Sequence, residues 1–382
     1  MPSKVFFTDF RTPTGFSLLK KLKKMLIAAG IDTIPCEGKF TAVKLHFGEP
    51  GNMAYLRPNY VEVIVQELKK LGGYVYLTDA NTLYSGGRSN AVNHLESAMK
   101  NGFNPITVSA PVIIADGLNG TDTVEMEVKG GEYCHTAIIG SAIAKADVII
   151  SVTHFKGHEM TGFGGTLKNL GMGAASRIGK MMLHADSKPM VYAENCIGCR
   201  LCEKSCAHGA ITVGSNRKAD IDYTKCVGCG QCIATCQKGG VVSPNDTNSH
   251  DLNCKIAEYT KAILDGKPSF HISFIMDVSP ECDCWPSNDA AIVPNVGMAA
   301  SFDPIALDMA CAELVMQTPT LPNTQYTDNH DKSEAEKCHH PHNCQGENDI
   351  FYYTHPDTDW KSALVHGEKI GLGTMDYELV RI

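Results

Sequence analysis

Short apolar runs alternate with amphipathic stretches over the first half of the chain. Runs rich in β-branched residues predict strands over residues 5–8, 41–47, 74–79, 112–115 and 147–153. Apolar residues at helical spacing predict helices over residues 16–29, 57–71, 89–101 and 136–144. Residues 123–129 have the pattern of an additional strand. Strands that alternate with helices predict an α/β fold, in which a mostly parallel sheet has helices on both faces.

The α/β pattern is interrupted and then resumes. Residues 195–243 are rich in Cys and Gly and contain only short helical turns. After them, helices are predicted over residues 254–264 and 301–315, and a strand over residues 270–278. An Asp-Pro pair marks the start of the later helix, because Asp caps helices and Pro favours their first turn. We therefore expect a small α+β module inserted into one α/β domain. Three domains in a row are the alternative.

Composition narrows the classes of function. The 382 residues are 43% hydrophobic and 20% charged, which is typical of a folded globular protein. The net charge of -8 and the lack of a basic stripe argue against nucleic acid as a partner. The first residues lack the regions of a signal peptide, and no apolar stretch is long enough to span a membrane. We therefore expect a cytoplasmic protein with no membrane partner.

Sixteen cysteines in such a protein indicate metal or redox chemistry more than disulfide bonds. Eight of them form a duplicated motif, in which CIGCRLCEKSCAHGAI is matched 30 residues later by CVGCGQCIATCQKGGV. Two-residue spacings bring three thiolates onto one 4Fe-4S cluster, and the fourth cysteine reaches the other cluster. We therefore predict two clusters with crossed ligation. The predicted ligands are Cys196, Cys199, Cys202 and Cys236 for the first cluster, and Cys226, Cys229, Cys232 and Cys206 for the second.

This motif predicts a ferredoxin-like module over residues 191–245, with residues 1–190 and 246–382 as the two parts of the α/β domain. Gly198 and Gly228 lie inside the cysteine loops, where a side chain would obstruct the turn. Two structural zinc sites are the alternative, since four cysteines also bind zinc. Zinc knuckles, however, pair two CxxC units across a gap and do not need third and fourth cysteines at these spacings.

Polar residues follow several of the predicted strands. In an open parallel sheet, ligands bind beyond the carboxyl ends of the strands. The polar residues at those ends are Lys44, His46, Glu49, Asp79, Asn81, Thr153, His154, Lys156 and His158. In the loop predicted over residues 153–173, a glycine-rich run precedes a helix-like stretch, and its amides are suited to face an anion. The predicted catalytic residues are His46, His154, Lys156, His158 and Lys168. Close helix packing with surface histidines is the alternative.

Two further groups of cysteines carry possible chemistry. Cys282 and Cys284 form a CxC pair beside acidic residues, which is suited to an extra metal ion or to a redox pair. A buried, inert pair is the alternative. A dense tract of soft ligands follows near the end of the chain: Cys338, His339, His340, His342 and Cys344. This tract suits zinc or another metal, or is a surface loop with incidental ligands.

Several motifs together resemble a known family of proteins. They are KLHFGEPGN at 44–52, residues 154–173, the duplicated cysteine motif, DVSPECDCWPSND at 277–289, SFDPIALDMA at 301–310 and GLGTMDYELV at 371–380. With them the chain resembles the domain-of-unknown-function family 362 of iron-sulfur center proteins from anaerobic bacteria and archaea. The resemblance implies recurrent polar positions at His46, His154, Lys156, His158, Lys168, Asn169, Cys282 and Cys284. It implies no substrate.

The leading functional hypothesis is a ferredoxin-linked oxidoreductase that delivers electrons from a redox partner protein to a site in the α/β domain. Imidazole and ammonium groups at that site would supply protons or hydrogen bonds to a small-molecule substrate. The alternatives are an electron carrier that docks on a partner reductase and an iron-sulfur protein that handles metals or acts as a sensor. A closed pocket lined by His46, His154 and His158 favours an enzyme, and a flat face favours docking.

Overall fold

The main sheet of the computed structural model has eight strands among the described residues, which are 2–83, 86–184, 188–226, 232, 235–236, 238–242, 247–335 and 349–382. In spatial order the strands are β16 (Tyr377–Arg381), β1 (Ser3–Asp9), β15 (Gly297–Ser301), β14 (Ser269–Ile275), β7 (Val148–His154), β2 (Phe40–Lys44), β3 (Tyr74–Asp79) and β4 (Val112–Ile114). Only β15 runs antiparallel to its neighbours, so the prediction of a mostly parallel sheet is confirmed.

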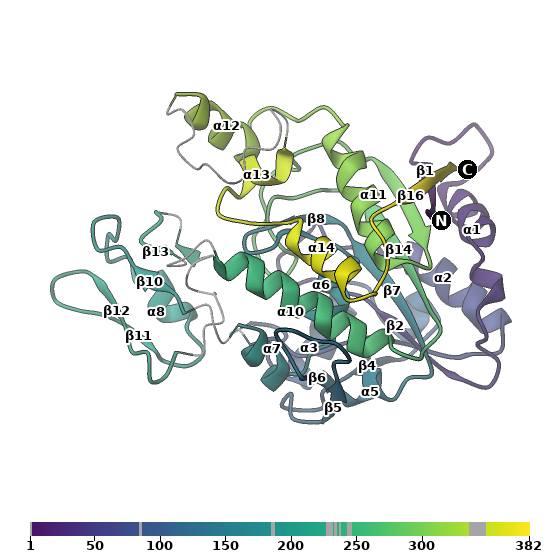
Figure 1. Ribbon diagram of the computed structural model, residues 1–382, viewed down its shortest axis with the longest axis horizontal. Helices are drawn as coiled ribbons and strands as arrows, with labels where there is room; N and C mark the ends of the chain where they lie inside the picture. Colours follow the sequence, from purple (N-terminus) through teal and green to yellow (C-terminus); the bar gives the residue numbers. More distant parts are fainter. Residues whose placement is uncertain are drawn as a thin grey trace.

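Helices cover both faces of this sheet (Figure 1). One face packs against α1 (Leu18–Ala28), α2 (Pro58–Lys70) and α3 (Ala91–Lys100). The other packs against α6 (Thr166–Gly171), α10 (Thr247–Leu264), α11 (Pro304–Met316) and α14 (Ser362–Lys369). All seven residues of β7 are buried, because a central parallel strand covered on both faces has no solvent side.

The remaining elements lie around this frame. They are the 3-10 turn η1 (Ile31–Thr33), α4 (Pro105–Val108), α7 (Arg177–Leu183), α12 (Gln325–Ala335), α13 (Ile350–Thr354) and the hairpin of β8 (Lys156–His158) with β9 (Gly162–Gly164). In the part of the chain that the structure describes, no helix has the length and apolarity needed to cross a bilayer.

The helix predicted over residues 136–144 is wrong in its first half. Residues Thr136–Gly140 form strand β6, which pairs antiparallel with β5 (Thr123–Glu127), and only α5 (Ser141–Ala144) is helical. A short apolar run such as TAIIG has no periodicity that separates a strand from a helix. The additional strand predicted over residues 123–129 is confirmed as β5, whose pairing with β6 is the contact that the local pattern could not reveal.

The described residues between 188 and 242 form a small unit with its own core. Its elements are β10 (Met190–Val191), α8 (Leu201–Ser205), β11 (Ile211–Val213), β12 (Ala219–Ile221) and β13 (Val241–Val242). Two antiparallel pairs, β10–β13 and β11–β12, enclose a small core of its own. The segment lies to one side of the main sheet in Figure 1, whereas the strands before and after it, β7 and β14, pair with each other in parallel.

The N-terminus of α6 is capped by a carboxylate from a distant helix. The backbone N–H groups of Thr166 and Leu167 donate to the two carboxylate oxygens of Asp308 at 2.7 and 2.9 Å. A Cβ at Gly165 would lie 2.6 Å from that carboxyl group, so the glycine is needed for the approach. The expectation that the glycine-rich run before α6 faces an external anion is therefore wrong, because Asp308 already occupies the position.

Loss of this cap should destabilise the fold. We expect Asp308→Ala to lower the free energy of unfolding by about 3 kcal/mol, because two buried N–H groups lose their acceptor. Asp308→Asn should cost less, since its side chain keeps one acceptor oxygen. Urea unfolding of both variants measures the difference. Equal stability of Asp308→Ala and the wild-type protein would contradict this role.

Candidate functional site

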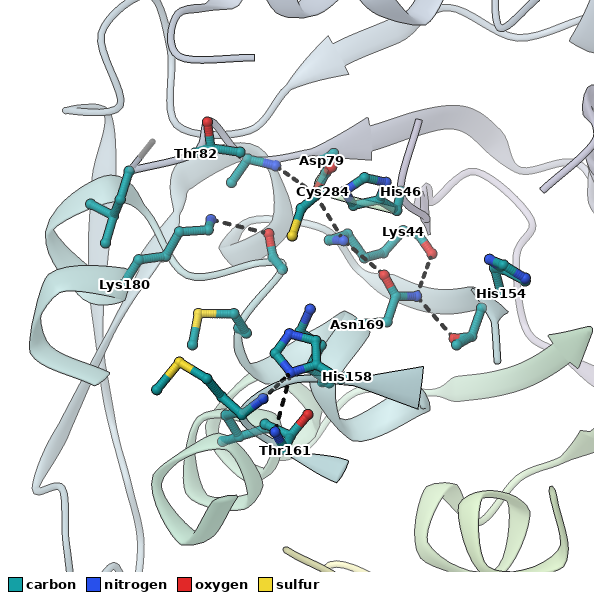
Figure 2. Close-up of a pocket in the computed structure, with 18 of the residues that line it drawn as sticks. Lys44, His46, Asp79, Thr82, His154, His158, Thr161, Asn169, Lys180 and Cys284 are labelled. Carbon is teal, nitrogen blue, oxygen red and sulfur yellow. Dashed lines mark hydrogen bonds and ion pairs between the residues drawn. The ribbon is translucent and has the colours of Figure 1, made fainter. Parts of the chain in front are cut away.

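A cavity of about 80 Å³ lies beyond the carboxyl ends of β2, β3 and β7 (Figure 2). It is lined by all five residues that the sequence predicts as catalytic: His46, His154, Lys156, His158 and Lys168. Cys284 joins them from the loop after β14. Residues that are up to 238 positions apart thus meet at one edge of the sheet, as parallel strands require of side chains that follow their ends.

The polar residues of 153–173 do not form one loop. His154 is the last residue of β7, Lys156 and His158 belong to β8, and Lys168 belongs to α6. The prediction of a single loop is therefore corrected to a strand end, a hairpin and a helix start. Short β-strands of this kind contain too few residues for a periodic signal.

Two of the cavity histidines have a defined neutral form. The Nδ1 atom of His46 accepts the N–H of Gly48 at 3.0 Å, so the proton of a neutral ring is on Nε2. Burial holds the pKa of His46 well below its ordinary value, which keeps the ring neutral. The Nδ1 atom of His158 likewise accepts the N–H groups of Met160 and Thr161 at 3.0 and 3.1 Å. Each ring therefore directs an Nε2–H donor away from its own backbone.

His154 has a different role, because both of its ring nitrogens face acceptors. Nδ1 lies 2.8 Å from a carboxylate oxygen of Asp283, and Nε2 lies 2.6 Å from the carbonyl oxygen of Met276. Only a doubly protonated imidazolium can donate to both. Burial raises the pKa of Asp283, but the positive charges of His154 and Lys156 outweigh it and lower the pKa overall. A buried ion pair thus ties the end of β7 to the loop after β14.

Cys282 and Cys284 share one proton. The Lys168 ammonium donates to Cys282 Sγ at 2.9 Å, and Cys282 is only 1% exposed. A hydrogen bond from Cys284 and the nearby positive charges of Lys168 and Lys156 hold the pKa of Cys282 well below its ordinary value. The same hydrogen bond raises the pKa of Cys284. Cys282 is therefore a buried thiolate and Cys284 the neighbouring thiol.

Asn169 links α6 to the ends of β2 and β7 through hydrogen bonds. Its Nδ2 donates to the Lys44 and Val152 carbonyl oxygens and to Thr153 Oγ1, at 3.2, 3.3 and 3.0 Å. Its Oδ1 accepts from Lys44 Nζ at 2.9 Å (Figure 2). Asn169 thus positions the helix that carries Lys168 against β2 and β7.

Three charged or titratable residues of the cavity were not predicted from sequence. They are Arg88 from the segment before α3, Lys180 from α7 and His184 from the C-terminal end of α7. Arg88 is 2% exposed and its Nε donates to Glu49 at 2.8 Å. None of the three follows a strand, so the rule on strand ends had no signal for them. Only the packing of their segments over the cavity brings them there.

A second cavity, of about 250 Å³, lies in the segment 188–242. Its lining includes Cys196, Cys199, Cys202 and Cys236, the four predicted ligands of the first cluster. Backbone N–H groups of Ala219 and Gly240 donate to the sulfur atoms of Cys196 and Cys236 at 3.4 and 3.1 Å. Gly198, between two of these cysteines, has a φ of +67°, and a Cβ there would lie 2.4 Å from the carbonyl oxygen of Arg217.

The predicted ligands of the second cluster are described only in part. The sulfur of Cys206 accepts the N–H of Ala210 at 3.3 Å, Cys232 is buried in the small core, and Cys226 packs against it. Cys229 and Gly228 lie outside the described residues, as does the tract Cys338, His339, His340, His342 and Cys344. Within the described ranges, no three His, Cys, Asp or Glu side chains are arranged to hold one metal ion. A 4Fe-4S cluster makes no such demand, because each cysteine binds a different iron.

The fold and the site define an α/β protein with a cation-lined cavity at the carboxyl ends of its parallel strands. The model of the family described as "Domain of unknown function (DUF362)" matches residues 41–313, and the chain belongs to this family. The resemblance to family 362 is thus confirmed, and the iron-sulfur clusters stay a prediction. No curated protein matches the chain.

Two solved structures have limited similarity. The lactate racemase apoprotein from Thermoanaerobacterium thermosaccharolyticum is 11% identical, with a TM-score of 0.39, and the match covers 100% of this chain and 83% of that one. A protein from Thermotoga maritima is 11% identical, with a TM-score of 0.40, and the match covers 80% of this chain and 61% of that one. At these scores the likeness says nothing about the reaction of this chain.

The charge of Lys168 should control the Cys282 thiolate. We expect Lys168→Met to raise the pKa of Cys282, because an adjacent ammonium favours the ionised sulfur. Lys168→Arg keeps the charge and should leave the pKa nearly unchanged. Ultraviolet absorbance of the thiolate against pH measures this, with Cys282→Ser as the blank. An identical titration in Lys168→Met and the wild-type protein would show that another group ionises the thiol.

Proposed function

We propose that this chain is an iron-sulfur electron-transfer protein, and that it acts as a ferredoxin-linked oxidoreductase. The observation that carries the proposal is that Cys196, Cys199, Cys202 and Cys236 line one cavity. The fourth of these belongs to the other half of the duplicated motif, 34 residues beyond Cys202. This is the crossed set expected for one cluster of a ferredoxin-like module inserted into the α/β domain.

The surroundings of these cysteines support a 4Fe-4S cluster. Four thiols supply the ligand set, and a cavity of about 250 Å³ leaves room between them. The amide hydrogen bonds to Cys196 and Cys236 would stabilise negative charge on the sulfur atoms. Cys226, Cys229, Cys232 and Cys206 would hold the second cluster. When bound, such clusters accept and donate single electrons.

The cavity of the α/β domain supports an enzyme over a docking protein. It is lined by His46, His154 and His158 and is recessed beneath the β8–β9 hairpin and α6, whereas a docking surface would be flat. The Nε2–H groups of His46 and His158 would donate hydrogen bonds to a substrate. Lys156 and Lys168 would compensate negative charge that develops on it.

The Cys282–Cys284 pair gives the cavity a redox group of its own. As a disulfide, the pair would accept two electrons and one proton to give the Cys282 thiolate and the Cys284 thiol. The neighbouring Lys168 stabilises the thiolate that leaves first when the disulfide bond is broken. A partner protein would supply the electrons through the iron-sulfur module. A carrier without chemistry of its own would have no use for such a pair beside a cavity.

Crossed ligation predicts which cysteine variants behave alike. We expect Cys196→Ser and Cys236→Ser each to lower the iron content by about half, because both would weaken the same cluster. Their electron paramagnetic resonance spectra after reduction should then agree with each other. Cys206→Ser should instead leave the other cluster intact and give a different residual spectrum. If Cys236→Ser matched Cys206→Ser and not Cys196→Ser, the ligation would not be crossed.

A redox role of the CxC pair predicts the number of electrons taken up. After mild oxidation, the wild-type protein should accept about two more electrons per chain from dithionite than the double variant Cys282→Ser/Cys284→Ser. The isolated cysteine variant Cys36→Ser is the control and should accept as many as the wild-type protein. Equal uptake by the double variant and the wild-type protein would exclude the redox role.

A further inference from the structure

The wall of the cavity in the α/β domain has an excess of positive charge. Its described lining contains five Lys and Arg side chains and one carboxylate, Asp79. The five cations are Lys44, Arg88, Lys156, Lys168 and Lys180. Lys44 Nζ lies 2.9 Å from Asp79, and the Lys168 ammonium is matched by the Cys282 thiolate. Most of these charges therefore have a partner among the described residues. All five side chains nevertheless contribute to the lining of one cavity.

Lys180 is the exception among these cations. Its side chain is buried, and its Nζ donates only to backbone carbonyls, those of Ala175 and, at 3.5 Å, Gly173. No carboxylate of the described chain lies within 4 Å of it. Its opposite charges, Asp116 and Asp79, act on it from beyond that distance. A buried ammonium group without a direct ion pair is costly, so a site of this kind is suited to an anionic ligand.

The side chains of Lys44 and Lys180 both approach Gly173. A Cβ at Gly173 would lie 2.5 Å from Lys44 Nζ, and the carbonyl of the same glycine accepts from Lys180. The glycine therefore lets two ammonium groups approach one backbone position. His46 adds a donor to the same cavity, because its buried Nε2 has no hydrogen-bond partner among the described residues.

Part of the remaining lining is apolar, which limits the kind of anion. Val152, Met160, Leu252 and Ile256 form part of the wall. A volume of about 80 Å³ holds only a few non-hydrogen atoms. An ion such as phosphate would leave the apolar part of the wall without a matching surface, whereas a short aliphatic acid offers both a charged group and an apolar body.

We propose that this cavity binds a small organic carboxylate, with Lys180 and the His46 Nε2–H donating to the carboxylate group and the Lys44 charge close by. This assignment names the substrate class of the proposed oxidoreductase and in that sense rests on the proposed function, although binding itself requires no electrons. The bound carboxylate would supply Lys180 with the direct ion pair that it does not form among the described residues.

The protonation of Lys180 makes such binding sensitive to pH. Burial is the main cause that lowers the pKa of Lys180, to about 8. The charged and titratable groups that act on it from the packed elements and from the end of α7 are Asp116, Asp79, Lys44, Arg88 and His184. Above pH 8 the free protein loses the ammonium, so affinity for an anion should fall as the pH rises through this value.

The test is binding of propionate to the full-length wild-type protein, measured by calorimetry or by ligand-observed NMR. Propionamide, which has nearly the same shape without the charge, is the ligand control. We expect propionate to bind about tenfold more tightly than propionamide and more tightly than inorganic phosphate. We also expect its affinity to fall above pH 8. Equal binding of propionate and propionamide, or stronger binding of phosphate, would overturn the assignment.

Variants of Lys180 test its contribution to propionate binding separately from that of the other cations. Lys180→Met should weaken propionate binding about tenfold, and Lys180→Arg should keep it and remove the decline above pH 8, because Arg stays charged. Lys145→Met, which removes an exposed charge outside the cavity, should bind as the wild-type protein does. Circular dichroism checks that each variant is folded. A Lys180→Met variant that is folded and binds propionate normally would overturn the assignment.

The outcome is independent of the iron-sulfur proposal. If the protein binds propionate but contains no iron or sulfide, the proposed electron transfer fails and the carboxylate site stands. If it contains both clusters but binds no carboxylate, the carboxylate site is wrong and the proposed electron transfer stands.

Discussion

The parallel pairing of β7 with β14 is the constraint on which the rest of the structure depends. Ser269 pairs with Ile149 and Phe274 with His154, so two strands separated by more than 110 residues end side by side. Their ends carry His154 and the loop with Asp283, which form the buried ion pair. The same pairing lets the chain leave the sheet after β7, form the cysteine-rich segment and return without breaking the main core.

Buried charged side chains are a second feature of this molecule. The cavity concentrates lysine, arginine and histidine side chains in a buried space, where an unpaired charge is costly. Glu49, Asp79 and Asp283 supply three of the partners, and the Cys282 thiolate supplies a fourth. A thiolate in place of a carboxylate converts a structural ion pair into a reactive one. Chemistry and stability therefore rest on the same contacts in this cavity.

Much of the frame could be predicted from the sequence, and the reasons for the failures are physical. Strands with β-branched residues, such as β3 and β7, were found because a buried parallel strand is apolar throughout. Strand β15 was missed because GMAAS has neither β-branched residues nor alternation. The apolar pattern of residues 136–140 predicts a helix, whereas their pairing with β5, which no local pattern contains, makes them a strand.

The site could be predicted where function follows a local rule. The five residues predicted as catalytic all line the cavity. Four of them follow the end of an apolar strand, where polar side chains are unusual, and Lys168 is indicated by the cluster of cations and histidines in residues 153–173. Lys180 and Arg88 could not be predicted from the sequence. Nothing in the residue pattern of α7 or of the segment before α3 indicates that these segments line a cavity. Asp308 caps α6 from 142 residues away, a contact that no local pattern contains.

The measurement that tests the central claim most directly is the iron and acid-labile sulfide content of protein purified without oxygen, with electron paramagnetic resonance after dithionite reduction. The account predicts about eight iron and eight sulfide per chain and the spectrum of two interacting reduced clusters. Zinc without sulfide would contradict it, and the proposed electron transfer would then be wrong.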